Sequence, residues 1–387
     1  MKKILIIHNQ YRELGGEDIA VNNEVEILKE HFNVEKLYFT NNIEIEKYFS
    51  QFMSFMRNKN MESSKVVENK LISFNPDIVY VHNTWFKASP VIFQILQKNN
   101  IKTFVKLHNF RFDCTRSYLS RLHLKGQVIC KACGMERDTF SLLNKYYKDS
   151  ILKSLIISRF GKKYFKILKN GNINILTLTK FQKKYLENMG FNSNKITIHR
   201  NYLKGDTHTS EGYNPESDYI VYAGRVSKEK GLQILIDAFL SSQSLPFKLK
   251  ILGNGPMYKE LVNKYSSNEK ILFLGQVSNR ETKEIIKNSR AVVTATTLHE
   301  GQPTLLCEAS LLGVPSIFPD NGGIKEFFPN DYELIFKNNN TKDLGKKLEM
   351  LNSKKLLEST SIRNEQFIKN LLNKDKYLDT FEKIINA

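Results

Sequence analysis

The sequence predicts an α/β protein built from two doubly wound, Rossmann-like domains that face each other across a cleft. At 387 residues, the chain exceeds the about 250–300 residues at which a single hydrophobic core stops growing. Short apolar runs alternate with stretches of helical periodicity, a pattern typical of parallel βαβ units. Residues 202–219 interrupt this alternation with a polar, turn-forming segment that has no apolar period.

These observations divide the chain into four parts. We expect an N-terminal domain at residues 1–201, a linker at 202–219 and a C-terminal domain at 220–370. Residues 371–387 have helical spacing, and we expect this last helix to pack back on the N-terminal domain.

In the first half, residues 18–31 have helical spacing and follow a Gly-containing loop. The apolar runs are short enough to be buried strands of a parallel sheet. The expected strands of this half are 4–7, 78–81, 103–107, 173–177 and 196–199.

The second half repeats the pattern, and each apolar run is followed by a loop with Gly or Pro and then a helix-like segment. The expected strands are 220–223, 249–252, 271–274, 291–295 and 316–318. Ser278 and Glu281 form a capping box for a helix that runs to about residue 288. Another helix should start at Pro303 and end at Gly313, since these residues favour those positions.

Composition limits the location and partners of the protein. The 58 Lys and Arg residues against 40 Asp and Glu give a formal charge of +18, which favours nucleic acid, an acidic membrane surface or phosphorylated substrates. A lysine-rich surface without a specific partner is the alternative. No apolar run has the length of a membrane-spanning helix or an export signal, and four cysteines do not make a disulfide scaffold. We therefore expect a cytoplasmic protein.

Two loops of the second half carry residues suited to binding an anion. Ligands of open α/β sheets bind outside the carboxyl ends of the strands. Arg225 and Lys230 follow the strand at 220–223 and could neutralise a diphosphate. The alternative for this pair is a solvated basic loop.

The second loop follows the strand at 291–295 and leads into the helix that starts at Pro303. A helix start offers backbone N–H groups and a positive dipole end. Glu300 and Glu308 flank this position and could accept hydrogen bonds from sugar hydroxyls. A solvated helical carboxylate is the alternative for Glu308. The glycines at 253–255 and 322–323 could let the backbone approach a ligand or could simply form tight turns.

With these loops, the second half resembles the large GT-B family of retaining glycosyltransferases called family 4. The matching segments are GRVSKEKG at 224–231, LGNGP at 252–256 and EGQPTLLCEASLLGVP at 300–315, and Glu300 and Glu308 fit the family's E-x7-E signature. GGE at 15–17, VHNTWFKASP at 81–90 and LHNFRFDC at 107–114 resemble a subgroup that builds bacterial surface polysaccharides.

The resemblance implies an acceptor-side domain at 1–201, a nucleotide-sugar-binding domain at 220–370, and a role for each matching residue. Arg225 and Lys230 would hold the diphosphate, Glu308 the ribose, Glu300 the transferred sugar, and Val277 would lie beside the base. The residues implied in catalysis are His108, Glu300, Arg225 and Lys230. The residues implied in donor binding are Gly15, Gly16, Gly253, Val277, Gln302, Pro303, Thr304, Leu305 and Glu308.

Two of these assignments have an alternative or a departure. His108 would face the donor sugar, and a structural histidine is the alternative. Many relatives have Phe-Gly where this chain has Gln302-Pro303, and Pro303 supplies no N–H. The sugar preference is therefore left open.

The implied reaction moves a hexose from a nucleotide diphosphate sugar to a glycan or lipid-linked acceptor in surface polysaccharide biosynthesis. The family retains the anomeric configuration. The sequence has no Asp-x-Asp motif, so we expect no divalent metal and no other cofactor. A nucleotide-sugar 2-epimerase of the same fold is the alternative enzyme, and a nucleic-acid-binding protein, for which no recognition motif is present, is a third hypothesis.

Two features of the first half suggest further partners. Cys114, Cys130 and Cys133 could hold zinc, but a tetrahedral site needs a fourth ligand, for which His123 or His108 are the candidates. Residues 145–169 combine many basic residues with apolar ones at roughly helical spacing. This suits a helix lying on an anionic membrane, which would give the protein a peripheral position on the inner face of the cell membrane. An ordinary packed helix with a solvated basic face is the alternative.

Overall fold

The computed structural model of the chain forms two compact units. It describes residues 1–11, 15–40, 60–85, 87–117, 124, 129–136, 150–204, 213–242 and 245–387. Unit 1 consists of Met1–Tyr202 together with Lys374–Ala387, and unit 2 is Leu203–Asn373. The end of the chain therefore returns to the unit in which it began.

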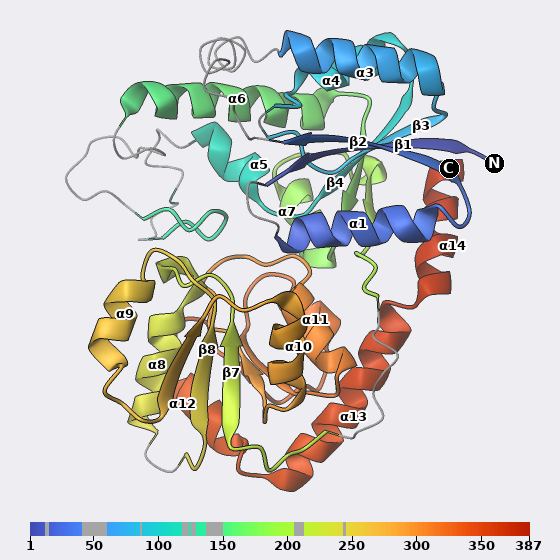
Figure 1. Cartoon of the computed structure of the whole chain (residues 1–387). Helices are drawn as coiled ribbons and strands as arrows, with labels where there is room; N and C mark the ends of the chain where they lie inside the picture. The colour runs from blue at the N-terminus through green and yellow to red at the C-terminus, as the bar shows by residue number, and fades with distance from the viewer. Residues whose placement is uncertain are drawn as a thin grey trace. The chain divides into compact units, whose positions relative to one another are not determined.

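Unit 1 contains a parallel sheet of six strands among the described residues, in the order β2-β1-β3-β4-β5-β6 (Figure 1). Its strands are β1 Lys3–Gln10, β2 Asn33–Thr40, β3 Ile78–Val81, β4 Lys102–Leu107, β5 Asn174–Thr177 and β6 Ile196–Ile198. Its α-helices are α1 Gly16–Leu28, α3 Met61–Phe74, α4 Val91–Lys98, α5 Arg111–Cys114, α6 Ile151–Asn170, α7 Lys180–Asn188 and α14 Lys374–Asn386. Single 3₁₀ turns lie at Thr115–Ser117 and Ser193–Lys195.

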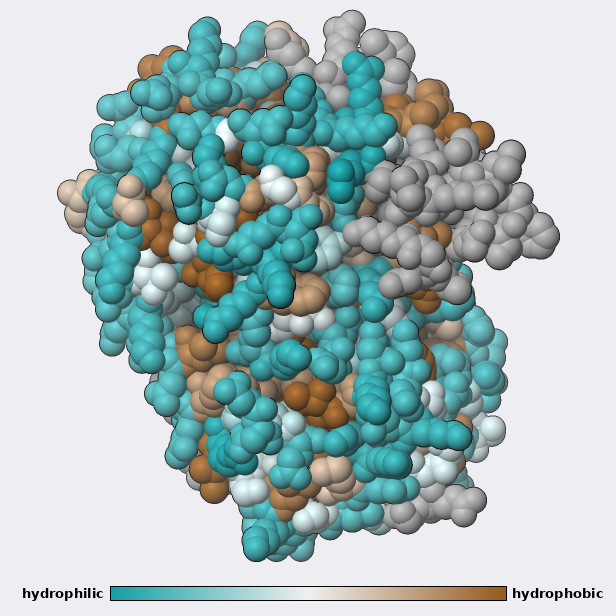
Figure 2. Space-filling view, turned by 180° about the vertical axis from the view of Figure 1, so that it is seen from behind, coloured by the Kyte–Doolittle hydropathy of each residue, from teal (hydrophilic) through white to brown (hydrophobic). Residues whose placement is uncertain are grey.

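Helices cover both faces of this sheet because successive strand residues point to opposite sides. On β1, Leu5 and Ile7 join a core with α3, α4, α6 and α7. Ile4 and Ile6 join a second core with α1 and the C-terminal helix α14. Both faces are apolar, as a parallel sheet requires. The outer surface, seen from behind in Figure 2, is largely hydrophilic with small hydrophobic patches.

Unit 2 has a second parallel sheet in the order β12-β11-β10-β7-β8-β9. Its strands are β7 Tyr219–Ala223, β8 Lys248–Leu252, β9 Ile271–Gly275, β10 Val292–Val293, β11 Ser316–Pro319 and β12 Ile335–Phe336. Its helices are α8 Leu232–Ser241, α9 Tyr258–Tyr265, α10 Asn279–Lys287, α11 Thr304–Leu311, α12 Thr341–Met350 and α13 Lys354–Leu371, with 3₁₀ turns at Lys228–Lys230 and Ile324–Phe327. The strand order reverses between β7 and β10, which makes the gap between their carboxyl ends the switch point of this sheet.

The predicted α/β fold is confirmed, and each of the ten expected strands overlaps an observed one. The Ser278–Glu281 capping box is present at the start of α10. The sequence analysis missed β2 and β12. β2 is an edge strand in which polar residues such as Glu35 and Lys36 interrupt the apolar ones, and β12 is two residues long.

The strand expected at 291–295 is shorter than predicted, since β10 covers Val292–Val293. The helix expected from Pro303 to Gly313 is α11, Thr304–Leu311, with Pro303 at its N-cap. In the segment expected to be a linker, residues 205–212 lie outside the described residues. Residues 213–219 belong to unit 2, where Ser217 Oγ donates a hydrogen bond to the Asn288 carbonyl at 2.6 Å.

A buried ion pair lies at the centre of unit 1. The side chains of Glu24 on α1 and Lys106 on β4 are fully buried and contact each other directly. Tyr80 on β3 donates to the second oxygen of Glu24 at 3.1 Å, and Lys106 Nζ donates to the Arg200 carbonyl at 3.2 Å. Tyr377 of α14 covers the pair, with its ring 5.9 Å from Lys106 Nζ. The pair therefore connects α1, two strands and the last helix.

Replacing Lys106 by Met should lower the free energy of unfolding of unit 1 by about 3–5 kcal/mol, because it leaves the Glu24 carboxylate buried without its cation. The double variant Glu24→Gln/Lys106→Met should lose less than the sum of the two single changes. Trp85 is the only tryptophan of the chain and is buried in unit 1, so urea unfolding followed by its fluorescence measures this unit. Additive losses would show that the two side chains do not interact energetically.

Candidate functional site

Unit 2 places the predicted cation and carboxylate loops at the switch point of its sheet. The loop after β7 carries Arg225 and Lys230, and the loop after β10 carries Glu300. Because β7 and β10 are parallel neighbours, both loops leave the same edge of the sheet. This is the position at which open α/β sheets bind ligands.

Backbone contacts hold these two loops together. The Glu229 carbonyl accepts hydrogen bonds from Thr297 N at 2.9 Å and Thr297 Oγ1 at 3.0 Å. Gly231 has a φ of +70°, and a Cβ at this position would lie 1.9 Å from the Ala295 carbonyl oxygen. Only glycine allows this approach, so the GRVSKEKG segment is also needed for the packing of the loop.

An ion pair joins Lys230 to Glu300. Lys230 Nζ donates to Glu300 Oε1 at 2.6 Å, and Thr296 Oγ1 donates to the same oxygen at 3.2 Å. The two side chains are 33% and 26% exposed. Burial lowers the pKa of Lys230, but the charge and hydrogen bond of Glu300 outweigh this effect and raise it, whereas Arg225 opposes the rise. Lys230 therefore stays a cation that is partly open to solvent.

The start of α11 adds backbone donors to this edge. The first α-helical hydrogen bond runs from Cys307 N to the Pro303 carbonyl at 3.0 Å, so the amides of Leu305 and Leu306 precede it. These amides lie at the positive end of the helix dipole. Glu308 follows within the first turn and a half and is half-buried. Backbone amides and an ammonium group beside a carboxylate can bind phosphate and sugar oxygens together.

The remaining residues predicted in unit 2 have packing roles in the structure. Gly253 has a φ of +122°, and a Cβ there would lie 2.0 Å from the Gly224 carbonyl oxygen. The absence of a side chain at Gly253 therefore allows close contact between these two loops. Val277 is half-buried against the core of unit 2. Gln302 is buried, and its carbonyl accepts from Thr304 N at 3.0 Å.

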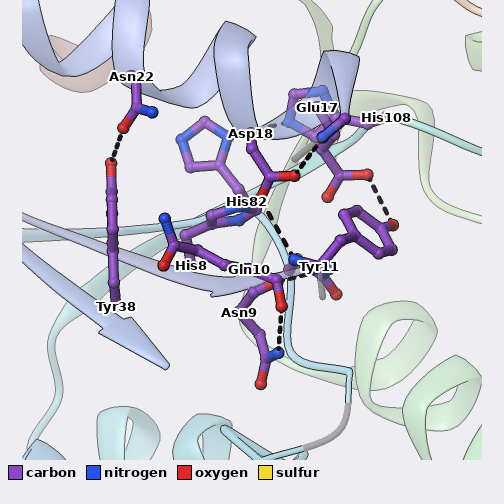
Figure 3. A network of polar contacts seen from close by, with 12 residues as sticks. His8, Asn9, Gln10, Tyr11, Glu17, Asp18, Asn22, Tyr38, His82 and His108 are labelled. Carbon is purple, nitrogen blue, oxygen red and sulfur yellow. Dashed lines mark hydrogen bonds and ion pairs between the residues drawn. The ribbon is translucent and has the colours of Figure 1, made fainter. Parts of the chain in front are cut away.

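In unit 1, Gly15 is the N-cap of α1 and Gly16 its first residue, so the helix begins two residues before the expected residue 18. Gly15 N donates to Asp18 Oδ2 at 2.9 Å, and Asp18 Oδ1 lies 2.9 Å from His8 Nε2 at the end of β1 (Figure 3). A Cβ at Gly16 would meet nothing within 4 Å. The backbone at Gly16 therefore has open space beside it, whereas Asp18 and His8 hold the turn in place.

His108 is oriented by a second histidine. His108 Nε2 lies 3.0 Å from His82 Nδ1, and His82 Nε2 lies 3.7 Å from Glu24 Oε2. Burial lowers the pKa of both imidazoles, and the Lys106 charge lowers it further, so both rings are neutral. A carboxylate facing Nε2 favours the proton on that nitrogen of His82. His82 Nδ1 then accepts a hydrogen bond from His108 Nε2–H. The alternative of a structural histidine accounts for every contact of His108 that the structure describes.

Glu17 is a candidate residue that the sequence analysis missed. Its Oε2 accepts from Tyr11 OH at 3.0 Å and from Asn109 Nδ2 at 3.4 Å. Burial raises the pKa of the Glu17 carboxyl to about 7, although the hydrogen bond from Tyr11 and the charge of Arg111 oppose the shift. Figure 3 shows Glu17 and Tyr11 turned toward each other beside His108. A carboxyl group with this pKa can both donate and accept a proton near neutral pH.

A repeated pattern in the sequence could have revealed this polar edge. Three apolar runs of unit 1 are followed by the dipeptide His-Asn, at residues 8–9, 82–83 and 108–109. The asparagines connect the strand ends: Asn83 Nδ2 donates to the Asn9 carbonyl at 2.9 Å, and Asn9 Oδ1 accepts from Ala88 N at 3.0 Å. A polar pair that recurs at equivalent strand ends indicates a shared edge, even without knowledge of the fold.

The three cysteines of unit 1 lie near one another. Cys114 and Cys130 are buried and Cys133 is half-buried. Hydrogen bonding with Cys130, and to a smaller extent with Cys133, raises the pKa of the Cys114 thiol well above its usual range. Within the described ranges, no group of three or more metal-ligating side chains is placed to hold an ion. His123 lies outside those ranges, so the zinc hypothesis stays a prediction.

The raised pKa of Glu17 predicts a pH dependence of stability. The folded protein binds this proton more tightly than the unfolded chain, whose carboxyl titrates near 4.5. The stabilisation is therefore complete below pH 4.5 and is lost as the pH rises toward 7, by up to about 1.4 kcal/mol per pH unit. Glu17→Gln should remove this contribution. The free energy of unfolding of wild type and variant is measured by Trp85 fluorescence in urea from pH 4.5 to 8, and the difference between them should change with pH. A difference that does not change with pH would show that the pKa of Glu17 is not raised.

Comparison with known proteins agrees with the geometry of unit 2. Residues 204–371 match the family described as glycosyl transferases group 1. TuaC of Bacillus subtilis (strain 168), whose name assigns it provisionally as a glycosyltransferase of teichuronic acid biosynthesis, is 28% identical over 194 residues, or 47% of this chain and 48% of that protein. WbnH of Escherichia coli, an O-antigen biosynthesis glycosyltransferase, is 26% identical over 177 residues, or 44% of this chain and 47% of that one. The chain thus spans about half the length of the curated relatives it matches.

Solved structures resemble the whole chain in fold. Anabaena Alr3699/HepE in complex with UDP and glucose has a TM-score of 0.67 at 14% identity, with complete coverage of both chains. Sucrose-phosphate synthase from Thermosynechococcus elongatus has a TM-score of 0.70 at 14% identity and covers 100% of this chain and 98% of its own. Unit 2 therefore resembles the group 1 glycosyltransferases in sequence, and the two parallel sheets of the chain have the fold of GT-B glycosyltransferase structures.

Proposed function

We propose that the protein transfers a sugar from a nucleotide diphosphate sugar to a glycan or lipid-linked acceptor in surface polysaccharide biosynthesis. The observation that carries this proposal is the Lys230–Glu300 pair beside the start of α11, at the switch point of unit 2. It combines a fixed cation, backbone donors and a carboxylate on one edge. These are the groups that a phosphorylated sugar needs.

Each group has a separate task in the proposed mechanism. Lys230 and Arg225 neutralise the diphosphate, and the first amides of α11 bind phosphate oxygens. Glu300 accepts hydrogen bonds from the transferred sugar, Glu308 from the ribose, and Val277 packs beside the base. Because these groups are placed before the reaction, they stabilise the charge that develops on the leaving diphosphate.

The proposed reaction retains the anomeric configuration and needs no metal ion. The bond between the anomeric carbon and the diphosphate oxygen breaks, and the sugar becomes oxocarbenium-like. The acceptor hydroxyl attacks the face that the diphosphate leaves, and a phosphate oxygen takes its proton. Gly15, Gly16 and His108 of unit 1 are proposed to contribute to the donor site, with the open backbone at Gly16 as support.

The choice of donor and location follows from the same observations. Structures of similar fold contain UDP or UDP-glucose, so UDP-sugars are the first donors to test, followed by GDP-, ADP- and CMP-sugars in a thermal-shift screen.

We propose a cytoplasmic enzyme that works at the inner face of the cell membrane, because α6 carries six basic and no acidic residues. The alternative, a 2-epimerase, would convert the free sugar nucleotide without an acceptor, whereas a transferase would not.

Lys230→Ala and Glu300→Ala should each lower turnover at least about 100-fold while the fold survives, because each removes a preplaced charge from the site. Turnover is measured as release of the nucleotide diphosphate from the donor chosen by the screen. Lys228→Ala, an exposed lysine of the same loop, is the matched control and should keep normal turnover. Near-normal rates in either site variant, with an unchanged circular dichroism spectrum, would count against the proposal.

Turnover should be unchanged in excess EDTA, because the proposed charge neutralisation comes from Lys230, Arg225 and helix amides. The measurement compares initial rates after dialysis against EDTA with rates after Mg²⁺ or Mn²⁺ is added. A rate that falls at least tenfold in EDTA and recovers with either metal would overturn the metal-independent mechanism but not the resemblance to the family.

A further inference from the structure

Helix α6 combines an exposed apolar end with a basic remainder. Its 20 residues contain six Lys or Arg and no acidic residue. Ile151, Leu152 and Leu155 at its start are 50%, 55% and 49% exposed. Arg159, Lys162 and Lys166 follow on exposed positions. Residues 145–149 of the basic stretch noted in the sequence lie outside the described residues.

The exposed apolar residues are not needed to hold α6 on the sheet. Its buried side, which includes Phe160 and Tyr164, packs against Trp85, with ring centroids 4.3 and 5.9 Å apart. Gly161 lets α6 contact the 3₁₀ turn Thr115–Ser117, since a Cβ at this position would lie 2.5 Å from the Thr115 carbonyl carbon. The buried residues of α6 run from Ser154 to Leu168, so Ile151, Leu152 and Leu155 are exposed on the side of the helix that does not pack on the sheet.

The basic end of α6 borders a cavity of about 460 Å³. The cavity lies between α4 and α6, at the amino ends of β4 and β5. Its lining includes apolar residues together with Lys163, Lys166 and several side-chain amides. The polar lining residues are Gln94, Gln97, Asn100, Thr103, Lys163, Lys166, Asn170 and Asn172. Ammonium and amide groups around a pocket suit a phosphate with attached hydroxyls.

We propose that α6 lies on an anionic lipid bilayer, with Ile151, Leu152 and Leu155 at the acyl boundary and a lipid phosphate headgroup in the cavity beside Lys163 and Lys166. A helix of this length extends about 30 Å, so both contacts fit one helix in the plane of the membrane. Among the described helices, none has the length and hydropathy to span a bilayer. The inference specifies the membrane contact without requiring transferase activity.

Charge complementarity favours a lipid surface over a protein partner. A basic helix surface without acidic residues attracts the diffuse negative charge of a leaflet, whereas aliphatic side chains at one end favour insertion into the acyl boundary. The attraction between exposed charges falls with ionic strength. Binding should therefore require anionic lipid and weaken with salt, but retain an apolar contribution.

The test is flotation of the full-length chain with vesicles of phosphatidylglycerol and phosphatidylcholine, compared with phosphatidylcholine alone, without donor or acceptor. The wild-type chain should float with the anionic vesicles at least tenfold more than with the neutral ones, and less at 0.5 M than at 0.1 M NaCl. Leu152→Ser/Leu155→Ser should lower partitioning at least tenfold at both salt concentrations. Equal partitioning into neutral and anionic vesicles, or an unchanged apolar variant, would overturn the proposal.

Two double variants distinguish headgroup binding in the cavity from general attraction between basic residues and the anionic surface. Lys163→Gln/Lys166→Gln changes the cavity, and Arg159→Gln/Lys162→Gln removes the same charge from the same helix outside the cavity. Loss of two charges alone should lower partitioning into anionic vesicles about 25-fold. A larger loss in Lys163→Gln/Lys166→Gln supports a headgroup bound in the cavity, and equal losses in the two variants exclude it. Lys342→Gln/Lys346→Gln on α12, also an exposed pair, should bind as wild type. Because flotation needs no catalysis, its outcome is independent of the proposed transferase activity.

Discussion

The carboxylate of Glu24 is the interaction on which the polar end of unit 1 depends. It pairs with Lys106, accepts from Tyr80 and faces His82, which in turn contacts His108. A fully buried charge is tolerated only when its partners surround it. The strands that end here therefore cannot shift relative to α1 without breaking the pair. The positions of His8 and His108 follow from this constraint.

The corresponding pair in unit 2 differs in exposure, and this difference suits a different purpose. Lys230 and Glu300 are 33% and 26% exposed, so water or a ligand can reach the ammonium group. A diphosphate could take over hydrogen bonds that Glu300 now accepts, at little cost in desolvation, because the cation is already partly solvated. A buried pair such as Glu24–Lys106 has no such freedom. We therefore interpret one pair as a support and the other as a binding group.

The sequence predicted the elements that repeat and missed those that depend on long-range contacts. Apolar runs identified the inner strands, because burial on both faces leaves no polar positions. β2 was not predicted because, as an edge strand, it retains polar residues. The loops with Lys230 and Glu300 were predicted from their places after strands, but their ion pair depends on the contact between Gly231 and Ala295. Glu24 and His82 were missed because their partners lie far away in the chain, and Glu17 was missed because the shift of its pKa comes mainly from burial in the folded unit.

The return of the last helix to unit 1 has a consequence for biosynthesis. Unit 2 is one continuous segment, whereas unit 1 needs α14, whose Tyr377, Phe381 and Ile385 complete one of its cores. Chains grow from the N-terminus, and domains fold as their residues leave the ribosome. The unit that is made first therefore has one sheet face covered only in part, by α1, until α14 has been made. Loss of α14 would damage the unit that contains the first strand rather than the unit that directly precedes this helix.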